Sequence, residues 1–518
     1  MSPETFRALG HRLVDQIAER LAAIPNGPVT RGEQPKAIRA ALGLGGPLPE
    51  RGEDAAALLE RTTRLLFEHS LFNGHPRFMG YITSSPAPIG ILADLLASAV
   101  NPNVGAYSLS PAATEIEAET VRWIAELIGY PKDCGGILVS GGNMANFIGF
   151  FAARAAKAPW DIREQGAAGA SRLRVYTSAE THTWIQKAAD LSGLGTSAVR
   201  WIPTDVDQRM DMEALREQVE ADRKAGDVPI MVIGTAGSVS TGAVDPLPEI
   251  AKFCREQHLW FHVDGAYGAL AAAVGRGPQA EAGLDPTAAG DAAEGAKPLV
   301  PSELLALSEA DSVAVDPHKW LYAPLEAGCA LVRDPAKLVA AFSYRPVYYH
   351  LEEEATNYVE YGMQNSRGFR ALKVWLALRH AGAEGYRQMI ADDIRLSGDL
   401  GRAVAAQQEL ELYTQELSIT TFRYIPQDLR RRVASASEPG DTELDEYLNK
   451  LNQEVLDRLQ KGGEAFVSPA VIDGRYLLRA CIVNFHTDVA DVEALPGIVI
   501  KTGRAVDQSL RPTALRRE

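Results

Sequence analysis

The sequence predicts an α/β fold with a mostly parallel, seven-stranded sheet in a large domain. Short apolar runs alternate with segments of helical periodicity, which is typical of strands connected by crossover helices. Several of these runs end in glycine or in a polar side chain, at the place where open α/β sheets bind their ligands. We expect the strands at Gly136–Val139, Leu173–Thr177, Ala198–Ile202, Pro229–Gly234, Trp260–Asp264, Ser312–Val315 and Cys329–Val332.

The N-terminal segment, residues 1–85, is predicted to be helical. Ser2 can cap a helix that starts at Pro3 and runs to about Ile24, and a second helix is expected around Ala55–His69,. The first helix carries an apolar stripe, which either joins the core of the chain or is covered by a second copy in a dimer. The stripe consists of Phe6, Leu9, Leu13, Ile17 and Leu21.

The C-terminal part is expected to form a smaller α+β domain from about Gly385, with strands near Ile419–Tyr424 and Tyr476–Phe485,. The expected domains are therefore residues 1–85, 86–384 and 385–518. This division agrees with the roughly three domains that a chain of this length suggests.

Composition and charge narrow the possible partners. The formal net charge of −15 argues against a nucleic-acid partner and an anionic membrane surface, because both would repel the protein,. No apolar stretch of about twenty residues occurs, so no membrane-spanning helix is expected. Charged residues near the N-terminus do not fit a secretory signal. The four cysteines are isolated, without the spacing of a metal site,. We expect a cytoplasmic protein with free thiols and no metal centre.

The segment Asp311–Trp320 is the stretch around which the predicted site is organised. Pro317 stops its strand, so His318 and Lys319 follow directly beyond the strand end,. Apolar neighbours would lower the pKa of Lys319 below the ordinary value of about 10.4, and a neutral amine can form a Schiff base with an aldehyde cofactor. A surface lysine in a turn is the alternative, and the Pro-His-Lys-Trp context favours the cofactor.

The motif Ser-Val-Ala-Val-Asp-Pro-His-Lys-Trp, residues 312–320, resembles the cofactor-lysine motif of the group II pyridoxal-phosphate (PLP) amino-acid decarboxylases. The resemblance runs from about Phe6 to the C-terminal domain. It implies the fold-type-I architecture of PLP-dependent transferases and a homodimer. It also implies pyridoxal 5'-phosphate bound by His318 and Lys319, and release of the α-carboxylate of an L-amino acid as CO2.

A phosphate cradle is predicted at Ser140–Asn146, where a glycine-rich turn leads from a strand into a helix. Glycines let the backbone approach a ligand, and a helix N-terminus offers N–H groups and a positive dipole end. The amides of Gly142 and Asn143 are the expected donors. A plain strand-to-helix turn is the alternative, because the segment is neither a Walker loop nor a GxGxxG fingerprint.

Asp264 ends the apolar strand that begins at Trp260, and burying this acid without a partner would be costly,. A protonated pyridine nitrogen is a fitting partner, since the ion pair keeps the ring cationic and lets it accept electrons. Ala266 shares a face with Asp264 and is expected to lie under the ring. A helix-capping role for Asp264 is the alternative.

The resemblance assigns further roles to residues outside these motifs. It implies that His182 stacks on the cofactor ring, although a structural hydrogen bond is the alternative. Ser238 retains the hydroxyl of the family's Ala-Gly-Thr-Thr segment, which reads Ala-Gly-Ser-Val in this chain. The spacing to the following helix places Tyr358 on the tyrosine of a mobile, solvated catalytic loop that acts at Cα. Tyr361 is the competing candidate.

Tyr81, Ser84 and Tyr107 are the expected substrate-pocket residues. Tyr81 lies where aromatic decarboxylases have a tyrosine and glutamate decarboxylases usually have a glutamine, and Trp320 stands where the latter commonly have Met. The resemblance therefore implies an aromatic or other neutral amino acid. The alternatives are an acidic substrate held by Arg77 or another basic residue, an aldehyde synthase that couples decarboxylation to oxidative deamination, and a non-catalytic PLP-binding protein.

Overall fold

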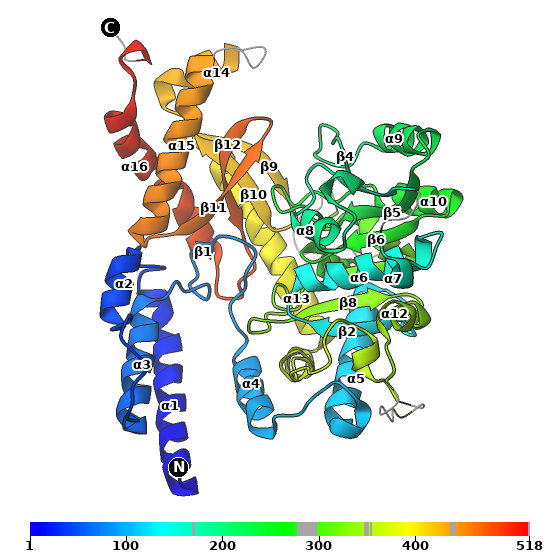
Figure 1. Cartoon of the computed structure of the whole chain (residues 1–518). Coiled ribbons are helices and arrows are strands. Elements are labelled where there is room, and N and C mark those ends of the chain that lie inside the picture. Colours follow the sequence, from blue (N-terminus) through cyan, green and yellow to red (C-terminus); the bar gives the residue numbers. More distant parts are fainter. Residues whose placement is uncertain (168–170, 277–297, 347–351, 353–354, 436–441, 516–518) are drawn as a thin grey trace. The chain divides into compact units, whose positions relative to one another are not determined.

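The computed structural model describes residues 1–167, 171–276, 298–346, 352, 355–435 and 442–515 (Figure 1). The chain divides into two compact units. The small unit contains Met1–Tyr81, Leu396–Thr414 and Thr420–Glu518, and the large unit contains Ile82–Arg395 and Gln415–Ile419. The N-terminal helices thus group with C-terminal strands. The division into the three consecutive domains stays a prediction.

The seven-stranded sheet of the large unit confirms the predicted α/β fold. Its strands follow the order β2-β8-β7-β6-β5-β3-β4. The pairs β4–β3, β3–β5, β5–β6 and β6–β7 are parallel, whereas β8 runs antiparallel to both β2 and β7. Each predicted strand is present, as β2 (Gly135–Val139), β3 (Leu173–Ser178), β4 (Val199–Ile202), β5 (Val228–Thr235), β6 (Trp260–Asp264), β7 (Ser312–Val315) and β8 (Gly328–Val332).

Helices pack against this sheet and bury its central strands. Every residue of β2, β3, β6, β7 and β8 is buried, so apolar residues can point to both faces of these strands,. The helices of the large unit include α4 (Pro88–Val100), α5 (Pro111–Ile128), α6 (Gly142–Lys157), α7 (Ile162–Gln165), α8 (Trp184–Leu191), α9 (Met212–Lys224), α10 (Leu247–Gln257) and α12 (Pro335–Phe342). The long helix α13 (Ala371–Ala405) is kinked at Gly382, whose φ is +68°.

The small unit contains a second sheet, in which β1 pairs in parallel with β11. Its order is β1-β11-β12-β10-β9. The predicted N-terminal helices are confirmed, because Ser2 caps a helix at Pro3–Ala23 and a second helix spans Ala55–His69. The elements are α1 (Pro3–Ala23), α2 (Pro35–Ala41), α3 (Ala55–His69), β1 (Phe78–Met79), β9 (Leu410–Glu416), β10 (Ile419–Tyr424), α14 (Arg430–Ser435), α15 (Thr442–Gly462), β11 (Phe466–Ile472), β12 (Arg475–Cys481) and α16 (Val489–Leu510).

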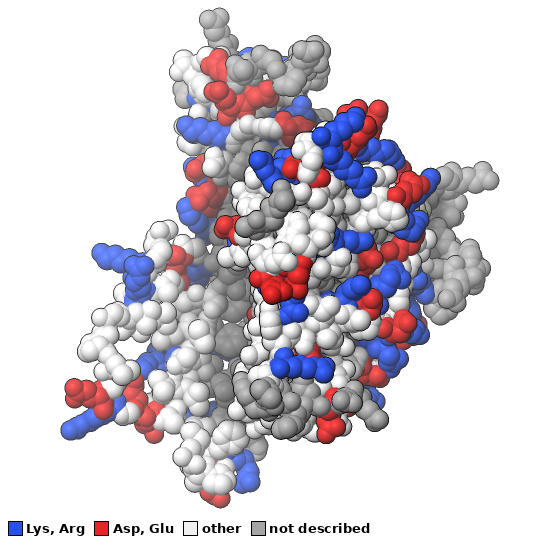
Figure 2. Space-filling view, turned by 45° about the vertical axis from the view of Figure 1, so that its right-hand side comes forward, with Lys and Arg blue, Asp and Glu red and all other residues white. Residues whose placement is uncertain are grey.

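Several general features of the described ranges bear on function. No helix within them is long and apolar enough to cross a bilayer. The same ranges hold no group of His, Cys, Asp and Glu side chains suited to a metal ion. All four cysteines are free thiols. On the face shown in Figure 2, acidic and basic side chains are interspersed.

His262 anchors a buried polar network between β6 and α6. Its Nδ1 lies 2.8 Å from Oγ of Ser312, and its Nε2 lies 2.8 Å from Oδ1 of Asn146. Oγ of Ser312 also accepts a hydrogen bond from Nε1 of Trp260 at 2.8 Å. Burial lowers the pKa of His262 to about 4, although the nearby Asp264 raises it in part. The imidazole is therefore neutral in the folded protein at pH 7.

We expect His262 to make the protein sensitive to acid. A histidine in the unfolded chain titrates near pH 6.5 and the folded one near 4,. The stability contributed by neutral His262 is therefore complete above about pH 6.5 and is lost as the pH falls toward 4. Between pH 7 and pH 5 this group alone should remove about 2 kcal/mol. Asp245 acts in the opposite direction, because burial raises its pKa to about 6.

The test compares the free energy of unfolding of the wild type and of His262→Gln, measured by urea denaturation at pH 7 and pH 5. Glutamine keeps a hydrogen-bonding side chain but cannot take up the proton, so the variant should lose about 2 kcal/mol less on acidification. The contribution of Asp245 is common to both proteins and cancels. His11→Gln, at an exposed position of α1, should retain the wild-type pH dependence. An unchanged pH dependence in His262→Gln would contradict the assignment.

Candidate active site

The candidate active site lies at one edge of the seven-stranded sheet. The parallel strands β3, β5, β6 and β7 run toward this edge, where Thr235 pairs in register with Asp264 and Asp264 pairs with Ala314. Because the carboxyl ends of parallel strands meet at the same edge, the segments that follow them converge. These segments carry most of the residues that the sequence singled out.

Lys319 is held beside a buried carboxylate. Its Nζ lies 3.4 Å from Oδ2 of Asp316, and Nδ1 of His318 lies 3.2 Å from Oδ1 of the same residue. Asp316 exposes only 4% of its side chain. Burial raises the pKa of Asp316, while Lys319, His318 and the amide of Gly142 lower it in part. The expected apolar surroundings are thus only part of the environment of Lys319.

His318 is fixed by backbone contacts on both sides. Its Nδ1 lies 2.9 Å from the carbonyl oxygen of Ala327, and its own carbonyl accepts a hydrogen bond from Oγ of Ser84 at 2.8 Å. Burial lowers the pKa of His318, so the ring is neutral at pH 7. Ser84 therefore holds the turn that presents Lys319. A contact of Ser84 with substrate stays a prediction.

The glycine-rich turn lies directly against this cluster. Gly141 precedes α6 with a φ of +124°, in a region that side chains rarely adopt. A Cβ at Gly142 would come within 2.7 Å of both the Cβ of Ala266 and Oδ2 of Asp316, so only glycine fits there. The amides of Gly142 and Asn143 precede the first amides that bond within the helix. They lie at the positive end of the helix dipole.

Asp264 is buried, and two elements orient its carboxylate. Oδ2 accepts a hydrogen bond from Nε1 of Trp184 at 2.7 Å, and Oδ1 accepts one from the backbone N–H of Ala266 at 3.2 Å. Trp184 begins α8 and is 1% exposed, so the bond lies out of water. Each carboxylate oxygen keeps a lone pair for a further donor.

His182 belongs to the same electrostatic cluster. The residue is exposed, and its Nδ1 accepts a hydrogen bond from the backbone N–H of Trp184 at 3.3 Å. Desolvation of the covered part of the ring lowers the pKa of His182; Asp264 raises it and Lys319 lowers it further. Such charge effects require proximity. His182 therefore lies close to Asp264 and to Lys319.

Ser238 is buried in the loop after β5 and is bonded within that loop. Its Oγ lies 2.8 Å from Oγ1 of Thr241. Asp245 closes the same loop, because it accepts the backbone N–H groups of Thr235 at 2.7 Å and of Met210 at 2.8 Å. These bonds shape the loop beside Asp264. A contact between Ser238 and a cofactor stays a prediction.

Tyr358 is packed into the core of the large unit. It begins the short helical turn Tyr358–Glu360 and is 2% exposed. The guanidinium of Arg367 lies 4.7 Å from the centre of its ring, and the ring of Tyr361 meets it edge-on at 5.8 Å. Arg367 is itself buried in an ion pair with Glu117. The predicted solvated position of Tyr358 is wrong, because this buried charge pair draws the segment against the sheet. Its catalytic role stays a prediction.

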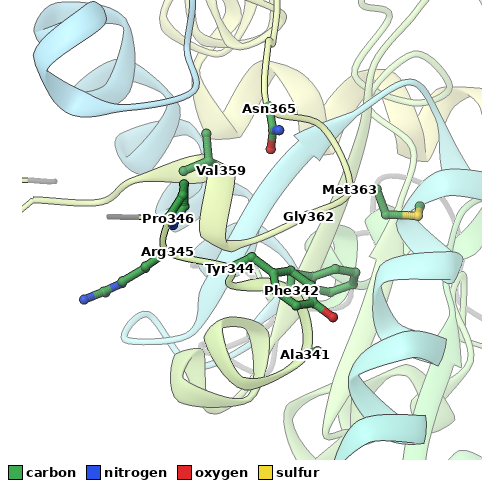
Figure 3. A pocket seen from close by; sticks show the side chains of 9 residues that line it. All are labelled: Ala341, Phe342, Tyr344, Arg345, Pro346, Val359, Gly362, Met363 and Asn365. Atoms are coloured by element: carbon green, nitrogen blue, oxygen red, sulfur yellow. The ribbon is translucent and has the colours of Figure 1, made fainter. Parts of the chain in front are cut away.

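A hollow of about 690 Å³ lies beside this segment (Figure 3). Arg345 lies at its edge and pairs with Glu360, with Nη2 3.0 Å from Oε2. None of the residues that line the hollow is a predicted site residue, so the hollow does not identify the chemistry. The lining consists of Ala341, Phe342, Tyr344, Arg345, Pro346, Val359, Gly362, Met363 and Asn365.

The predicted substrate-pocket residues are divided between the two units. In the large unit, the backbone N–H of Tyr107 donates to Oδ1 of Asn357 at 3.1 Å. In the small unit, Tyr81 is 53% exposed and has a φ of +51°. Arg77, also in the small unit, pairs with Asp491 at 3.3 Å. The charge of Arg77 therefore has a partner within the protein.

Trp320 and two other residues have contacts that the sequence did not predict. Trp320 is fully buried and donates from Nε1 to Asp393 at 3.0 Å, so it anchors the turn inside the core. Asp316 and Trp184 contact Lys319 and Asp264 directly, yet neither was singled out. Asp316 carried a usable signal, because it is a strand-end acid three residues before the lysine. Trp184 carried none, since its contact arises only on folding.

These groups fit a phosphorylated pyridoxal. Lys319 would supply the amine, Asp264 would supply a buried carboxylate for a cationic ring nitrogen, and the amides at the start of α6 suit a phosphate. Gly142 has no room for a Cβ, because its backbone lies directly against Ala266 and Asp316. Oδ1 of Asp316 is buried at the same place without a hydrogen-bond donor among the described residues.

Comparison with known proteins agrees with this geometry. Residues 39–278 and 291–425 match the family described as pyridoxal-dependent decarboxylase conserved domain. The chain is 31% identical to an aromatic-L-amino-acid decarboxylase of Bacillus atrophaeus, over 95% of this chain and 94% of the relative. It is 27% identical to phenylacetaldehyde synthase of Petunia hybrida, over 96% and 94% of the two chains.

A solved structure is similar along nearly the whole length. The crystal structure of Oryza sativa TDC with PLP and tryptamine matches with a TM-score of 0.83 at 26% identity, covering 98% of this chain and 99% of that one. The seven-stranded sheet, the helical N-terminus and these matches confirm the fold-type-I architecture. This protein belongs to the pyridoxal-dependent decarboxylases, whose cofactor is pyridoxal 5'-phosphate.

Proposed function

We propose that this enzyme removes the α-carboxylate of an aromatic or other neutral L-amino acid as CO2 and releases the amine. The observation that carries the proposal is that His182, Asp264 and Lys319 lie close together at the carboxyl ends of the parallel strands, beside the N-terminus of α6. The 31% identity to an aromatic-L-amino-acid decarboxylase supports the substrate class.

Pyridoxal phosphate, when bound, supplies the electron sink for the pair released from the Cα–carboxylate bond. Lys319 holds the cofactor covalently through its amine. Asp264, fixed by Trp184, keeps the ring nitrogen protonated. His182 packs on the ring and limits its movement. The residues proposed to hold the cofactor are Gly142, Asn143, His182, Ser238, Asp264, Ala266, His318 and Lys319.

The proton that reaches Cα requires a donor. Tyr358 is the first candidate and Tyr361 the second, and burial raises the pKa of both phenols, so that both carry their proton at pH 7. Tyr358 would first have to leave its packing under Arg367. His182 is the third candidate, because its charge interactions place it near Lys319.

Three alternatives have specific tests. An acidic substrate would need a free cation, and the pairing of Arg77 with Asp491 removes the one that the sequence suggested. An aldehyde synthase is favoured by the similarity to phenylacetaldehyde synthase. A non-catalytic PLP-binding protein would release no product. A panel of aromatic, neutral and acidic L-amino acids, assayed for CO2, amine, ammonia and peroxide, distinguishes the proposed decarboxylase from these three alternatives.

We also infer that the enzyme is a homodimer in the cytoplasm. None of the residues of α1 or α3 is buried, and Phe6 is 64% exposed. On α4, exposed apolar side chains follow helical spacing, and such faces are commonly covered by a partner. They are Leu92, Leu95, Leu96 and Val100, each at least 51% exposed. The free cysteines support a reducing compartment,.

Lys319 should be the attachment point of the cofactor. Protein saturated with pyridoxal phosphate should be yellow, and borohydride reduction should fix one pyridoxyl group on the peptide that contains Lys319, as read by mass spectrometry. Lys319→Arg keeps the charge beside Asp316 but should lose the label. Lys187→Arg should keep it, although Lys187 lies near enough to lower the pKa of His182. A label on another lysine would refute the assignment.

Asp264→Asn should fold but lose turnover. An amide cannot hold the ring nitrogen protonated, so kcat should fall by about a thousandfold, which corresponds to about 4 kcal/mol. The circular dichroism spectrum should stay that of the wild type. Asp311→Asn replaces an acid at the opposite edge of the sheet, where it accepts the N–H of Phe261, and should retain most activity. A near-native kcat in Asp264→Asn would show that the carboxylate is structural.

Tyr358 should decide the fate of the electron pair on Cα. Phenylalanine keeps the ring and loses the proton, so Tyr358→Phe should still release CO2 while amine falls and aldehyde, ammonia and peroxide rise. The measurement is the product ratio of the wild type, Tyr358→Phe and Tyr361→Phe on one substrate. A shift in Tyr361→Phe alone would transfer the role to Tyr361. If neither variant shifts, His182 is tested next.

A further inference from the structure

Asp316 places a buried carboxylate at the N-terminus of α6. Its Oδ2 lies 2.7 Å from the point that a Cβ of Gly142 would occupy, and its Oδ1 lies 3.8 Å from the equivalent point on Gly141. The backbone N–H of Gly142 stabilises the carboxylate. A helix N-terminus attracts anions, and in this protein the chain supplies one of its own.

The charged groups that face Asp316, within the part of the chain that is described, come from three segments. Its own turn contributes Lys319 at 3.4 Å and His318 at 3.2 Å. The loop after β3 contributes His182, which interacts both with Asp316 and with Asp264 at the end of β6. Burial lowers the pKa of both histidines, so neither ring is charged at neutral pH.

Oδ1 of Asp316 is the unsatisfied atom of the cluster. It is buried, and no donor among the described residues forms a hydrogen bond to it. Nδ1 of His318 lies 3.2 Å away but bonds to the carbonyl oxygen of Ala327 at 2.9 Å. An ionised carboxylate at this place would repel a phosphate dianion bound to the same amides, at a distance where water screens little. A protonated carboxyl group would instead donate a hydrogen bond to a phosphate oxygen. The two protonation states therefore have opposite effects on phosphate binding.

We propose that binding of the cofactor's phosphate at the N-terminus of α6 is coupled to the uptake of one proton by Asp316. The inference rests on the proposed function in that it assigns this cradle to the phosphate. Uptake of a proton makes affinity depend on pH. The dissociation constant of a phosphate ester should rise by about tenfold for each pH unit above the pH at which Asp316 ionises in the ligand-free protein, so binding becomes weaker.

Pyridoxine 5'-phosphate is the probe, because it carries the ring and the phosphate but has no aldehyde to react with Lys319. Titration calorimetry of the cofactor-free full chain at pH 8, in two buffers of different ionisation enthalpy, gives the dissociation constant and the number of protons taken up. At pH 8 the ester is a dianion, since its second pKa is about 6. The phosphate therefore takes up no proton from solvent, but the ring nitrogen beside Asp264 can. Proton uptake at the phosphate site is therefore the uptake measured with pyridoxine 5'-phosphate minus that measured with pyridoxine, which has the same ring nitrogen.

After the uptake measured with pyridoxine is subtracted, we expect the wild type to take up close to one proton at pH 8 and Asp316→Asn to take up close to none. The amide of asparagine donates to phosphate without a proton from solvent, so the variant should also bind the probe about tenfold or more tightly at pH 8. Asp311 lies directly before β7, at the opposite end of the strand from Asp316. The control variant Asp311→Asn should therefore behave as the wild type. Pyridoxine, which lacks the phosphate, should show the same proton uptake in all three proteins, because the ring nitrogen beside Asp264 is its only source.

Equal proton uptake in the wild type and Asp316→Asn would overturn the proposal. Loss of probe binding in a variant that keeps its melting temperature would also overturn it, because the carboxylate would then be a required part of the cradle. If Asp316→Asn does not fold, the wild type decides alone, since equal proton uptake with pyridoxine 5'-phosphate and with pyridoxine at pH 8 contradicts the coupling. The borohydride label on Lys319 tests the proposed function separately.

Discussion

Pairing of buried carboxylates constrains this site more than any other feature. Asp264 and Asp316 leave the sheet at the ends of neighbouring parallel strands, and an unpaired ion at either place would cost several kcal/mol,. Asp264 takes its donors from Trp184 and from its own loop, and Asp316 lies between His318 and Lys319. The contacts of these two acids bring the loop after β3 and the lysine turn into one place.

Glycines allow the backbone at the start of α6 to pack closely against the strand ends that carry the two acids. A Cβ at Gly328, the first residue of β8, would lie 2.3 Å from the carbonyl carbon of Gly141. A side chain at Gly328 would therefore keep these two backbone segments apart. Gly142 meets Ala266 and Asp316 in the same way. The start of α6 is therefore pressed against the ends of β6 and β7. An anion bound at those amides would lie beside Asp316, whose Oδ2 is 3.4 Å from Nζ of Lys319.

The buried ion pair between Arg367 and Glu117 holds the segment that carries Tyr358 and Tyr361. Arg367 and Glu117 expose 1% and 0% of their side chains, and Arg367 also donates to the carbonyl of Val104 at 2.8 Å. Glu117 accepts the backbone N–H of Leu138 at 2.9 Å. Breaking such a pair costs several kcal/mol, so Tyr358 beneath it is held firmly. Proton donation from Tyr358 would therefore require a larger rearrangement than donation from a solvated loop.

The sequence by itself determined the elements and the strand-end chemistry of this protein. All seven strands of the large sheet and the helices at Pro3–Ala23 and Ala55–His69 follow from periodicity, capping and turn residues, which act over a few neighbours,. Lys319, Asp264 and Gly142 were identifiable for the same reason, since each stands at the end of an apolar run. The resemblance to a decarboxylase motif added the cofactor.

Only the tertiary structure decided which side chains complete the site. Trp184 bonds Asp264 across 80 residues, and Arg367 meets Glu117 across 250, so local patterns carry no trace of either contact. Trp320, which suggested an aromatic substrate, is enclosed by Asp393 and Tyr267 in the core. Tyr358, expected in solvent, is buried beneath a charge pair. Burial and pairing of charge depend on how distant segments converge, and that convergence exists only in the folded chain.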